Sequence, residues 1–185
     1  RASIINKHVE KLGKKPLNVL AILPVRGSLL DARSMPLQNL GDQKLIDWSI
    51  DAALESKLVN DVVVTSPDEE VINHVKESYG ERVDIMKRPN ELARINLDLD
   101  KTILWVLNEL PKSNRPEAIV ILNIESPFRS SIYVTKAINA MQLYDVDVVI
   151  GVRMDDDLFY LHDGSGLKPR TKKESLRLER DDLFR

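Results

Sequence analysis

The sequence predicts an α/β fold in three layers, built on a mostly parallel, doubly wound sheet with a small β-hairpin dimerisation arm. Four short runs are continuously apolar instead of alternating with polar residues, and they cover residues 18–25, 61–66, 118–124 and 146–152. Such runs are typical of parallel strands that are buried on both faces. Longer amphipathic segments separate them, so strands and helices alternate along the chain.

Four segments have the apolar spacing of amphipathic helices, and they cover residues 44–56, 68–80, 99–111 and 130–144. The acids that open the second segment favour a helix N-terminus, and Gly80 is suited to end that helix. Ser130 or Ser131 is a suitable N-cap for the fourth. Residues 83–86 are a candidate for one further short strand. In such sheets, ligands bind beyond the carboxyl ends of the strands.

Composition excludes several classes of protein. The formal charge of −2 and the pI of about 6.0 argue against a nucleic-acid binder, which usually has a strong basic bias. No apolar run approaches the roughly 20 residues that cross a bilayer, so we expect no membrane partner. The chain has no cysteine, which excludes disulfides, thiolate metal sites and a cysteine nucleophile. We therefore expect a cytoplasmic protein.

The chain divides into an N-terminal basic extension at 1–17 and an α/β domain at 18–185. The extension lacks the apolar centre of a signal peptide. Both ends stop in charged sequence without a turn signal, so we expect a truncated C-terminus. An arm at about 153–180 contains the turn sequence "DGSG" between two short apolar segments, which predicts a β-hairpin. Because arms of this kind commonly pack on a second subunit, we expect a homodimer.

The loop after the first predicted strand carries Arg26, Gly27 and Ser28. A glycine there lets the backbone approach an anion, and successive N–H groups can hold a phosphate. The guanidinium of Arg26 suits phosphate oxygens. The alternative is a simple turn with a surface arginine. The sequences G-x-x-x-x-G-K-[ST] and G-x-G-x-x-G are both absent, which excludes a standard kinase loop and a dinucleotide fold.

Two other predicted strand ends carry polar residues. Asn123 ends the third apolar run, where its amide can bind a base edge or sugar hydroxyls, and Ser126 follows in a turn fixed by Pro127. Helix capping by Ser126 or Ser130 is an equally good interpretation. Arg88 precedes Pro89, which favours an extended backbone. Its guanidinium either points into the cleft or belongs to an ordinary loop.

Metal-binding and catalytic histidine sites have little support in the sequence. The three histidines, at positions 8, 74 and 162, share no ligand spacing. The acidic run at 155–157 is suited to a divalent cation, but acidic runs are more often solvated turns.

Taken in order, the loops resemble one enzyme family. The segments are "AILPVRGS", "PLQNL", "DVVVTSPDEEV", "RPNELA", "VILNIESPFRS" and "LERDDL", spread from Asn18 to Asp182. Their sequence is similar to that of the acylneuraminate cytidylyltransferases and their relatives that act on other nonulosonates. Those enzymes typically contain "PARGGSK.IP.KN", "STDDEEI", "RP.ELA", "LQPTSPLR" and "R.D". The ordered set is specific, although each motif alone is not.

The resemblance implies a function: transfer of CMP from CTP to a sialic-acid-like 2-keto sugar acid, giving a CMP-sugar and pyrophosphate. It also implies Mg²⁺ as cofactor and a homodimer formed through the arm. Phosphoryl transfer needs mainly positioning and charge neutralisation, which such a loop supplies.

The resemblance also implies roles for single residues. Arg26, Gly27 and Ser28 would hold the triphosphate, Asn39 would contact the cytosine and Arg88 the nucleotide. Asn123 and Ser126 would contact the sugar. Arg180 matches the arginine that is treated as catalytic in the family. The metal ligands stay unassigned, because in the family they follow "R.D" by a few dozen residues.

The signature loop departs from the family pattern. It is longer between Gly27 and Pro36, it lacks the second glycine and its lysine, and Gln38 replaces the lysine before Asn39. Arg33 is a candidate substitute for one lost charge. Glu125 stands where the family has threonine. These changes leave open a second hypothesis, a non-catalytic domain on the same fold that binds a nucleotide or a partner, and a third, a transferase that uses another base.

Overall fold

The structure is a computed structural model that describes residues 15–28, 31–94, 97–152, 154–155, 160–169 and 183–184. The chain forms two compact units, one that ends at Val149 and one that begins at Ile150. Most of the predicted N-terminal extension and parts of the predicted arm lie outside the described residues.

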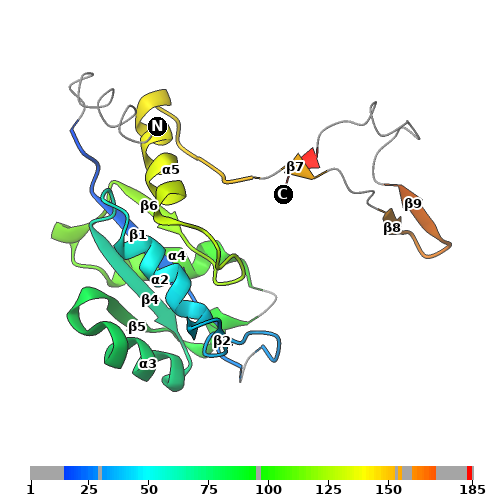
Figure 1. Cartoon of the computed structure of the whole chain (residues 1–185), viewed down its shortest axis with the longest axis horizontal. Helices are drawn as coiled ribbons and strands as arrows, with labels where there is room; N and C mark the ends of the chain where they lie inside the picture. The colour runs from blue at the N-terminus through cyan, green and yellow to red at the C-terminus, as the bar shows by residue number, and fades with distance from the viewer. Residues whose placement is uncertain are drawn as a thin grey trace. The chain divides into compact units, whose positions relative to one another are not determined.

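The first unit is built on a parallel sheet of four strands: β1 (Val19–Pro24), β4 (Asp61–Ser66), β5 (Asp84–Lys87) and β6 (Ala118–Ile121). Their order is β5-β4-β1-β6 (Figure 1). The chain thus moves outward from β1 to β5 and then returns to β6 on the other side of β1. The winding direction reverses at that point, which confirms the predicted doubly wound sheet and puts its switch point between β1 and β6.

Helices cover both faces of the sheet: α2 (Leu45–Leu54), α3 (Glu69–Tyr79), α4 (Leu99–Glu109) and α5 (Ser131–Tyr144). Alternate residues of β1 explain this arrangement. Ala21 and Leu23 belong to the core that contains the apolar sides of α2, α3 and α5, whereas Leu20 and Ile22 pack with Ile103 and Val106 of α4. Because β1 is buried on both sides, its sequence is apolar without alternation.

The helix ends largely follow the predicted signals. Asp68 is the N-cap of α3, where its side chain accepts a hydrogen bond of 3.0 Å from the backbone N–H of Glu70. Gly80 ends α3 with a positive φ of 56°. Ser130, one of the two predicted candidates, is the N-cap residue of α5, and Asp145 ends that helix with a φ of 54°.

The predicted strand at 146–152 is wrong. This segment is described throughout and contains no strand; the side chains of Val148 and Ile150 are 70% and 74% exposed. A strand exists only when a neighbour pairs with it, and an apolar run does not itself provide one. Within the described residues, β6 pairs on one side only, with β1.

Short elements complete the first unit. The hairpin of β2 (Asn39–Leu40) and β3 (Gln43–Lys44) precedes α2. Single 3₁₀ turns lie at Gly80–Arg82, Asn90–Ala93 and Lys112–Asn114. No helix in the described part of the chain is both long and apolar enough to span a bilayer.

The second unit contains the hairpin that "DGSG" predicts. β8 (Tyr160–His162) pairs antiparallel with β9 (Leu167–Pro169), and β7 (Met154–Asp155) pairs with β10 (Leu183–Phe184). In the turn, the Asp163 carboxylate accepts hydrogen bonds from the backbone N–H groups of Ser165 and Gly166. The ion pair with Lys168 and these bonds lower the pKa of Asp163 to about 2. The dimerisation role of this hairpin stays a prediction.

Candidate functional site

The loop after β1 folds back on itself. The backbone N–H of Val25 donates to the carbonyl of Thr65 at 2.9 Å, which joins the start of the loop to β4. The Ser34 hydroxyl donates to the carbonyl of Arg26, and the N–H of Asp31 donates to the carbonyl of Gly27 at 3.2 Å. The predicted anion-binding residues therefore lie at the carboxyl end of the sheet, where α/β domains bind ligands.

Arg88 lies beneath this loop and is 3% exposed. Its Nη2 donates to the Val25 carbonyl at 2.9 Å, and its Nη1 donates to the Thr102 hydroxyl at 3.3 Å. Nε has no hydrogen-bond partner. Of the two sequence-based interpretations, a guanidinium directed into the cleft or an ordinary loop residue, the geometry resembles neither: the side chain connects the end of β1 to α4.

Two positive charges, those of Arg26 and Arg88, lie close enough at this point to affect one another. Burial and, to a smaller extent, the nearby positive charge of Arg26 together lower the pKa of Arg88 to about 10. Neither guanidinium forms an ion pair within the described part of the chain. Two like charges close together create a local positive potential that favours an anion, and Asp31 and Asp68 place carboxylates at the same loop.

A pocket of about 360 Å³ adjoins the loop. It is lined by residues of the loop and of the start of α3, namely Ser28, Ser34, Met35, Pro36, Leu37, Gln38, Asp68, Glu70 and Val71. Among the predicted site residues that the structure describes, Ser28 alone lines it. The carboxylates of Asp68 and Glu70 were missed as site residues, because "TSPDEE" is fully explained as a helix cap. Their place beside Ser28 depends on the pairing of β4 with β1, which no local signal reveals.

Asn39 lies exposed in the β2–β3 hairpin, which is joined firmly to α2. The indole N–H of Trp48 donates to the Leu40 carbonyl at 3.0 Å, and the N–H of Leu45 donates to the Gln38 carbonyl at 2.9 Å. The candidate lysine substitute, Arg33, is 81% exposed and pairs with Asp31 at 3.2 Å. The hydrogen bond from the backbone N–H of Arg33, the Arg33 guanidinium and the charge of Arg26 lower the pKa of Asp31.

The predicted sugar-contacting residues lie in the turn after β6. Arg129 holds this turn: its Nη2 donates to the carbonyls of Asn123 at 2.6 Å and Ser126 at 3.2 Å. Phe128 packs edge-on against Trp48 with the ring centroids 5.9 Å apart. The side chains of Asn123 and Ser126 are exposed, so they are accessible to a ligand.

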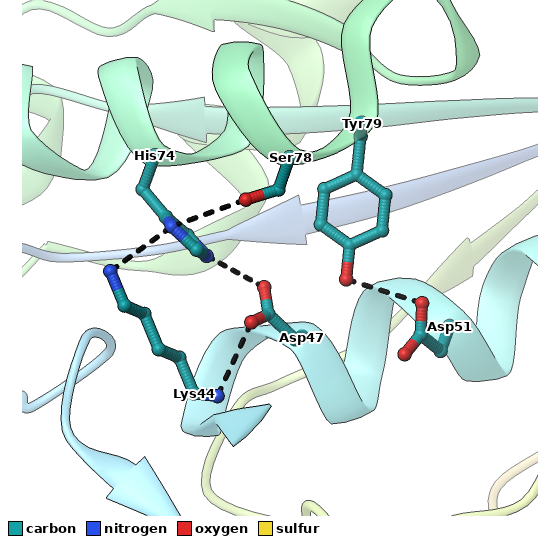
Figure 2. A network of polar contacts seen from close by, with 6 residues as sticks. All are labelled: Lys44, Asp47, Asp51, His74, Ser78 and Tyr79. Atoms are coloured by element: carbon teal, nitrogen blue, oxygen red, sulfur yellow. Dashed lines mark hydrogen bonds and ion pairs between the residues drawn. The ribbon is translucent and has the colours of Figure 1, made fainter. Parts of the chain in front are cut away.

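His74 belongs to a polar network between α2 and α3 (Figure 2). Its Nε2 contacts Asp47 Oδ1 at 2.8 Å, and Lys44 Nζ contacts its Nδ1 at 3.1 Å. In the same contact region, the Tyr79 hydroxyl donates to Asp51 at 3.2 Å. Because the ammonium of Lys44 can only donate, Nδ1 accepts, and Nε2 carries the proton toward Asp47. These contacts account for His74 as a structural residue.

Other predicted elements of the site are not brought together. Arg180, the predicted catalytic residue, lies outside the described residues, as do His8 and two of the three acids at 155–157. Within the described ranges, no group of three or more histidine, aspartate or glutamate side chains is placed to hold a metal ion.

Known structures have the same fold. A 4-diphosphocytidyl-2C-methyl-D-erythritol synthase from Anaerococcus prevotii aligns with a TM-score of 0.60 and 19% identity, over 84% of this chain and 63% of that one. A CMP:2-keto-3-deoxy-manno-octonic acid synthetase complexed with CTP aligns with a TM-score of 0.55 and 18% identity, over 73% of this chain and 50% of that one. These likenesses define the fold, a doubly wound α/β domain.

Sequence comparison gives the family. Residues 34–168 match the family described as Cytidylyltransferase. N-acylneuraminate cytidylyltransferase of Escherichia coli O18:K1:H7 is 32% identical over 124 residues, which are 67% of this chain and 28% of that protein. The chain belongs to the cytidylyltransferase family, as the sequence resemblance implied. It spans little more than a quarter of the length of this relative.

Proposed function

We propose that the protein transfers CMP from CTP to a sialic-acid-like 2-keto sugar acid. The anomeric hydroxyl oxygen attacks the α-phosphorus of CTP, the bond from that phosphorus to the bridging oxygen breaks, and pyrophosphate leaves. The hydroxyl proton is lost to solvent or to a base, and the product is a CMP-sugar. The observation that carries the proposal is the pair of neighbouring guanidiniums, Arg26 and Arg88, which form no close ion pair among the described residues and lie at the carboxyl end of the sheet in a cytidylyltransferase chain.

The roles proposed for the residues follow their positions. Backbone N–H groups of Gly27 and Ser28, with the charge of Arg26, would bind triphosphate oxygens. Arg88 would support the loop, since it holds the Val25 carbonyl by a hydrogen bond and adds positive potential near the triphosphate. Asn39 would contact the cytosine from the anchored hairpin. Such preorganised charge stabilises the transition state of phosphoryl transfer.

The acceptor would bind at the turn after β6, where Asn123 and Ser126 present exposed polar side chains. Arg180 would stabilise charge at the α-phosphoryl group. Mg²⁺ would neutralise triphosphate charge during the reaction, and we assign it no protein ligand. The sugar acid is proposed from the name of the Escherichia coli relative, which is an N-acylneuraminate cytidylyltransferase.

A homodimer that forms through the arm at about 153–180 is part of the proposal, with the reaction in the cytoplasm. The exposed Tyr160, Leu161 and Leu167 of the hairpin support it, because an apolar hairpin surface gains from burial against a second copy. Sedimentation of the wild type and of a Leu161→Asp variant tests this element. A monomeric wild type contradicts it.

The second candidate is a non-catalytic domain that binds a nucleotide or a partner. Gln38, which stands in the place of a family lysine, lines the pocket, and Arg33 is engaged with Asp31. The triphosphate would therefore meet fewer free cations than the family pattern supplies.

One experiment separates these candidates. Pyrophosphate release from CTP is measured with the full-length protein, Mg²⁺ and a panel of nonulosonates, alongside calorimetric titration of CTP. Turnover with at least one sugar acid is the expected result. Tight CTP binding without turnover on any panel member favours the binding domain. Absence of both contradicts the transferase and a domain that binds CTP.

A further inference from the structure

Gly27 has no space for a side chain, because the side chain of Asp68 occupies that space. A Cβ atom built on Gly27 would lie 1.8 Å from Oδ2 of Asp68 and 2.3 Å from its Cβ. The side chain of Asp68 therefore lies directly against the Gly27 backbone. Both residues are buried, Asp68 with 7% exposure. The loop after β1 thus contacts the start of α3 where Gly27 meets Asp68.

Asp68 is itself held rigidly. Its Oδ1 accepts the hydrogen bond from the Glu70 N–H, and its own backbone N–H donates to the Ser66 hydroxyl at 3.1 Å. Ser66 is the last residue of β4, the strand that pairs with β1. The Asp68 side chain is thus held in place both by the start of α3 and by the end of β4. It packs as a fixed steric surface, or wall, against the backbone of Gly27.

We propose that Asp68 is the positioning residue of the anion-binding loop. Its side chain fills the space beside Gly27 and so sets where the backbone N–H groups of residues 26–28 lie. The inference rests on the proposed function, since the loop is the proposed triphosphate site. It goes further by assigning a role to a residue outside the loop, one that acts through the position of Gly27 and not through contact with the nucleotide.

A simple capping role makes a different prediction. As an N-cap alone, Asp68 is replaceable by asparagine or glycine with little change, because both are good N-cap residues. If the Asp68 side chain instead fixes the position of Gly27 by packing against it, asparagine can replace it, because asparagine has nearly the same shape. Glycine cannot, because it has no side chain to fill the space. Gly27→Ala is then tolerated only when Asp68→Gly removes the side chain that occupies the same space.

The test is a cycle of Gly27→Ala, Asp68→Gly and the double variant, with Asp68→Asn as the conservative replacement. Gly151→Ala is the matched control, because a Cβ there meets nothing within 4 Å and its φ is not positive. CTP affinity is measured by calorimetry. Hydrogen exchange of the amides at 26–28 is measured without nucleotide, and circular dichroism confirms the fold.

We expect each of the two single variants, Gly27→Ala and Asp68→Gly, to weaken CTP binding at least about tenfold. Each should also speed the hydrogen exchange of the amides at 26–28. The double variant should return to within about threefold of the wild type, because the alanine occupies part of the vacated space. Asp68→Asn and Gly151→Ala should bind within about threefold of the wild type.

Two results overturn the inference: a double variant weaker than both single variants, or Asp68→Gly that is unchanged in both affinity and exchange. If the wild type binds no CTP, the proposed function fails. The exchange cycle then decides the inference alone, since it reports loop position without nucleotide.

Discussion

The Nη2 atom of Arg88 donates a hydrogen bond of 2.9 Å to the carbonyl oxygen of Val25, the residue that follows β1. This bond joins the end of the central strand to the loop after β5, and the second bond of the guanidinium, to Thr102, continues the connection into α4. A buried arginine without a carboxylate costs desolvation free energy. The protein keeps this charge beside Arg26, under the loop proposed to bind triphosphate.

Replacing Arg88 with methionine removes both hydrogen bonds and leaves the Val25 carbonyl without that donor. We expect the free energy of unfolding to fall by about 1–3 kcal/mol at pH 7, as measured by urea denaturation. Arg33→Met is the matched control, because Arg33 is 81% exposed, and its effect should stay within about 0.5 kcal/mol. Equal effects of the two substitutions would show that the Arg88 bonds contribute no stability.

Asp51 gives a pH-dependent prediction. Burial raises its pKa above the usual 3.8, which outweighs the opposing hydrogen bond from Tyr79. The raised pKa means that the ionised carboxylate destabilises the fold above the folded-state pKa, and that this cost disappears as the pH falls toward 3.8. Asp51→Asn keeps an oxygen that accepts from Tyr79.

The Asp51→Asn variant should therefore be more stable than the wild type at pH 7, and the difference should shrink at pH 4. Urea denaturation at both pH values measures it. A variant that is less stable at pH 7 would mean that the charge itself strengthens the Tyr79 bond by more than burial costs.

The contact between Asp47 and His74 joins α2 to α3 (Figure 2). Both side chains are 12% exposed, so water competes weakly for the bond. A double-mutant cycle with Asp47→Ala and His74→Ala should give a coupling free energy of about 1 kcal/mol. The pair Ser78 and His74, separated by 3.4 Å, should couple more weakly. Additive effects of the first pair would contradict a direct stabilising bond.

Arg129 should affect the acceptor and not the nucleotide. It holds the carbonyls of Asn123 and Ser126, so Arg129→Met should loosen the turn proposed to bind the sugar acid. We expect KM for the acceptor to rise about tenfold, while the CTP dissociation constant changes less than about twofold. Steady-state kinetics and calorimetry measure the two values. An equal loss of both would place the turn in the nucleotide site instead.

The sequence was a good guide where burial alone decides the structure. β1 and β4 are buried on both faces, so their apolar runs mark them within one residue at each end. The helix at α3 is bounded by Asp68 and Gly80, whose capping chemistry is local. The segment at 146–152 has the same apolar signal but no partner strand, and a partner is a tertiary property that the run cannot encode.

The site was harder to predict for the same reason. The motifs identified the cytidylyltransferase family, whereas the role of the loop at Arg26 stays a prediction. They did not reveal that Arg88 bonds to the Val25 carbonyl, or that Asp68 lies against Gly27, because both contacts form between segments that follow different strands and are distant in sequence. A residue that positions another residue is hard to recognise from the sequence. Asp68 is equally well explained as a helix cap, and Arg88 as a loop residue.

The central claim is that the loop after β1 binds the triphosphate of CTP. Calorimetric titration of CTP into the wild type and into Arg26→Ala tests it most directly, with UTP as the comparison for the base. The account predicts CTP binding by the wild type that is weakened at least about tenfold in Arg26→Ala, the effect of losing a charged hydrogen bond. Equal CTP affinity of the two proteins, with the fold intact, would contradict it.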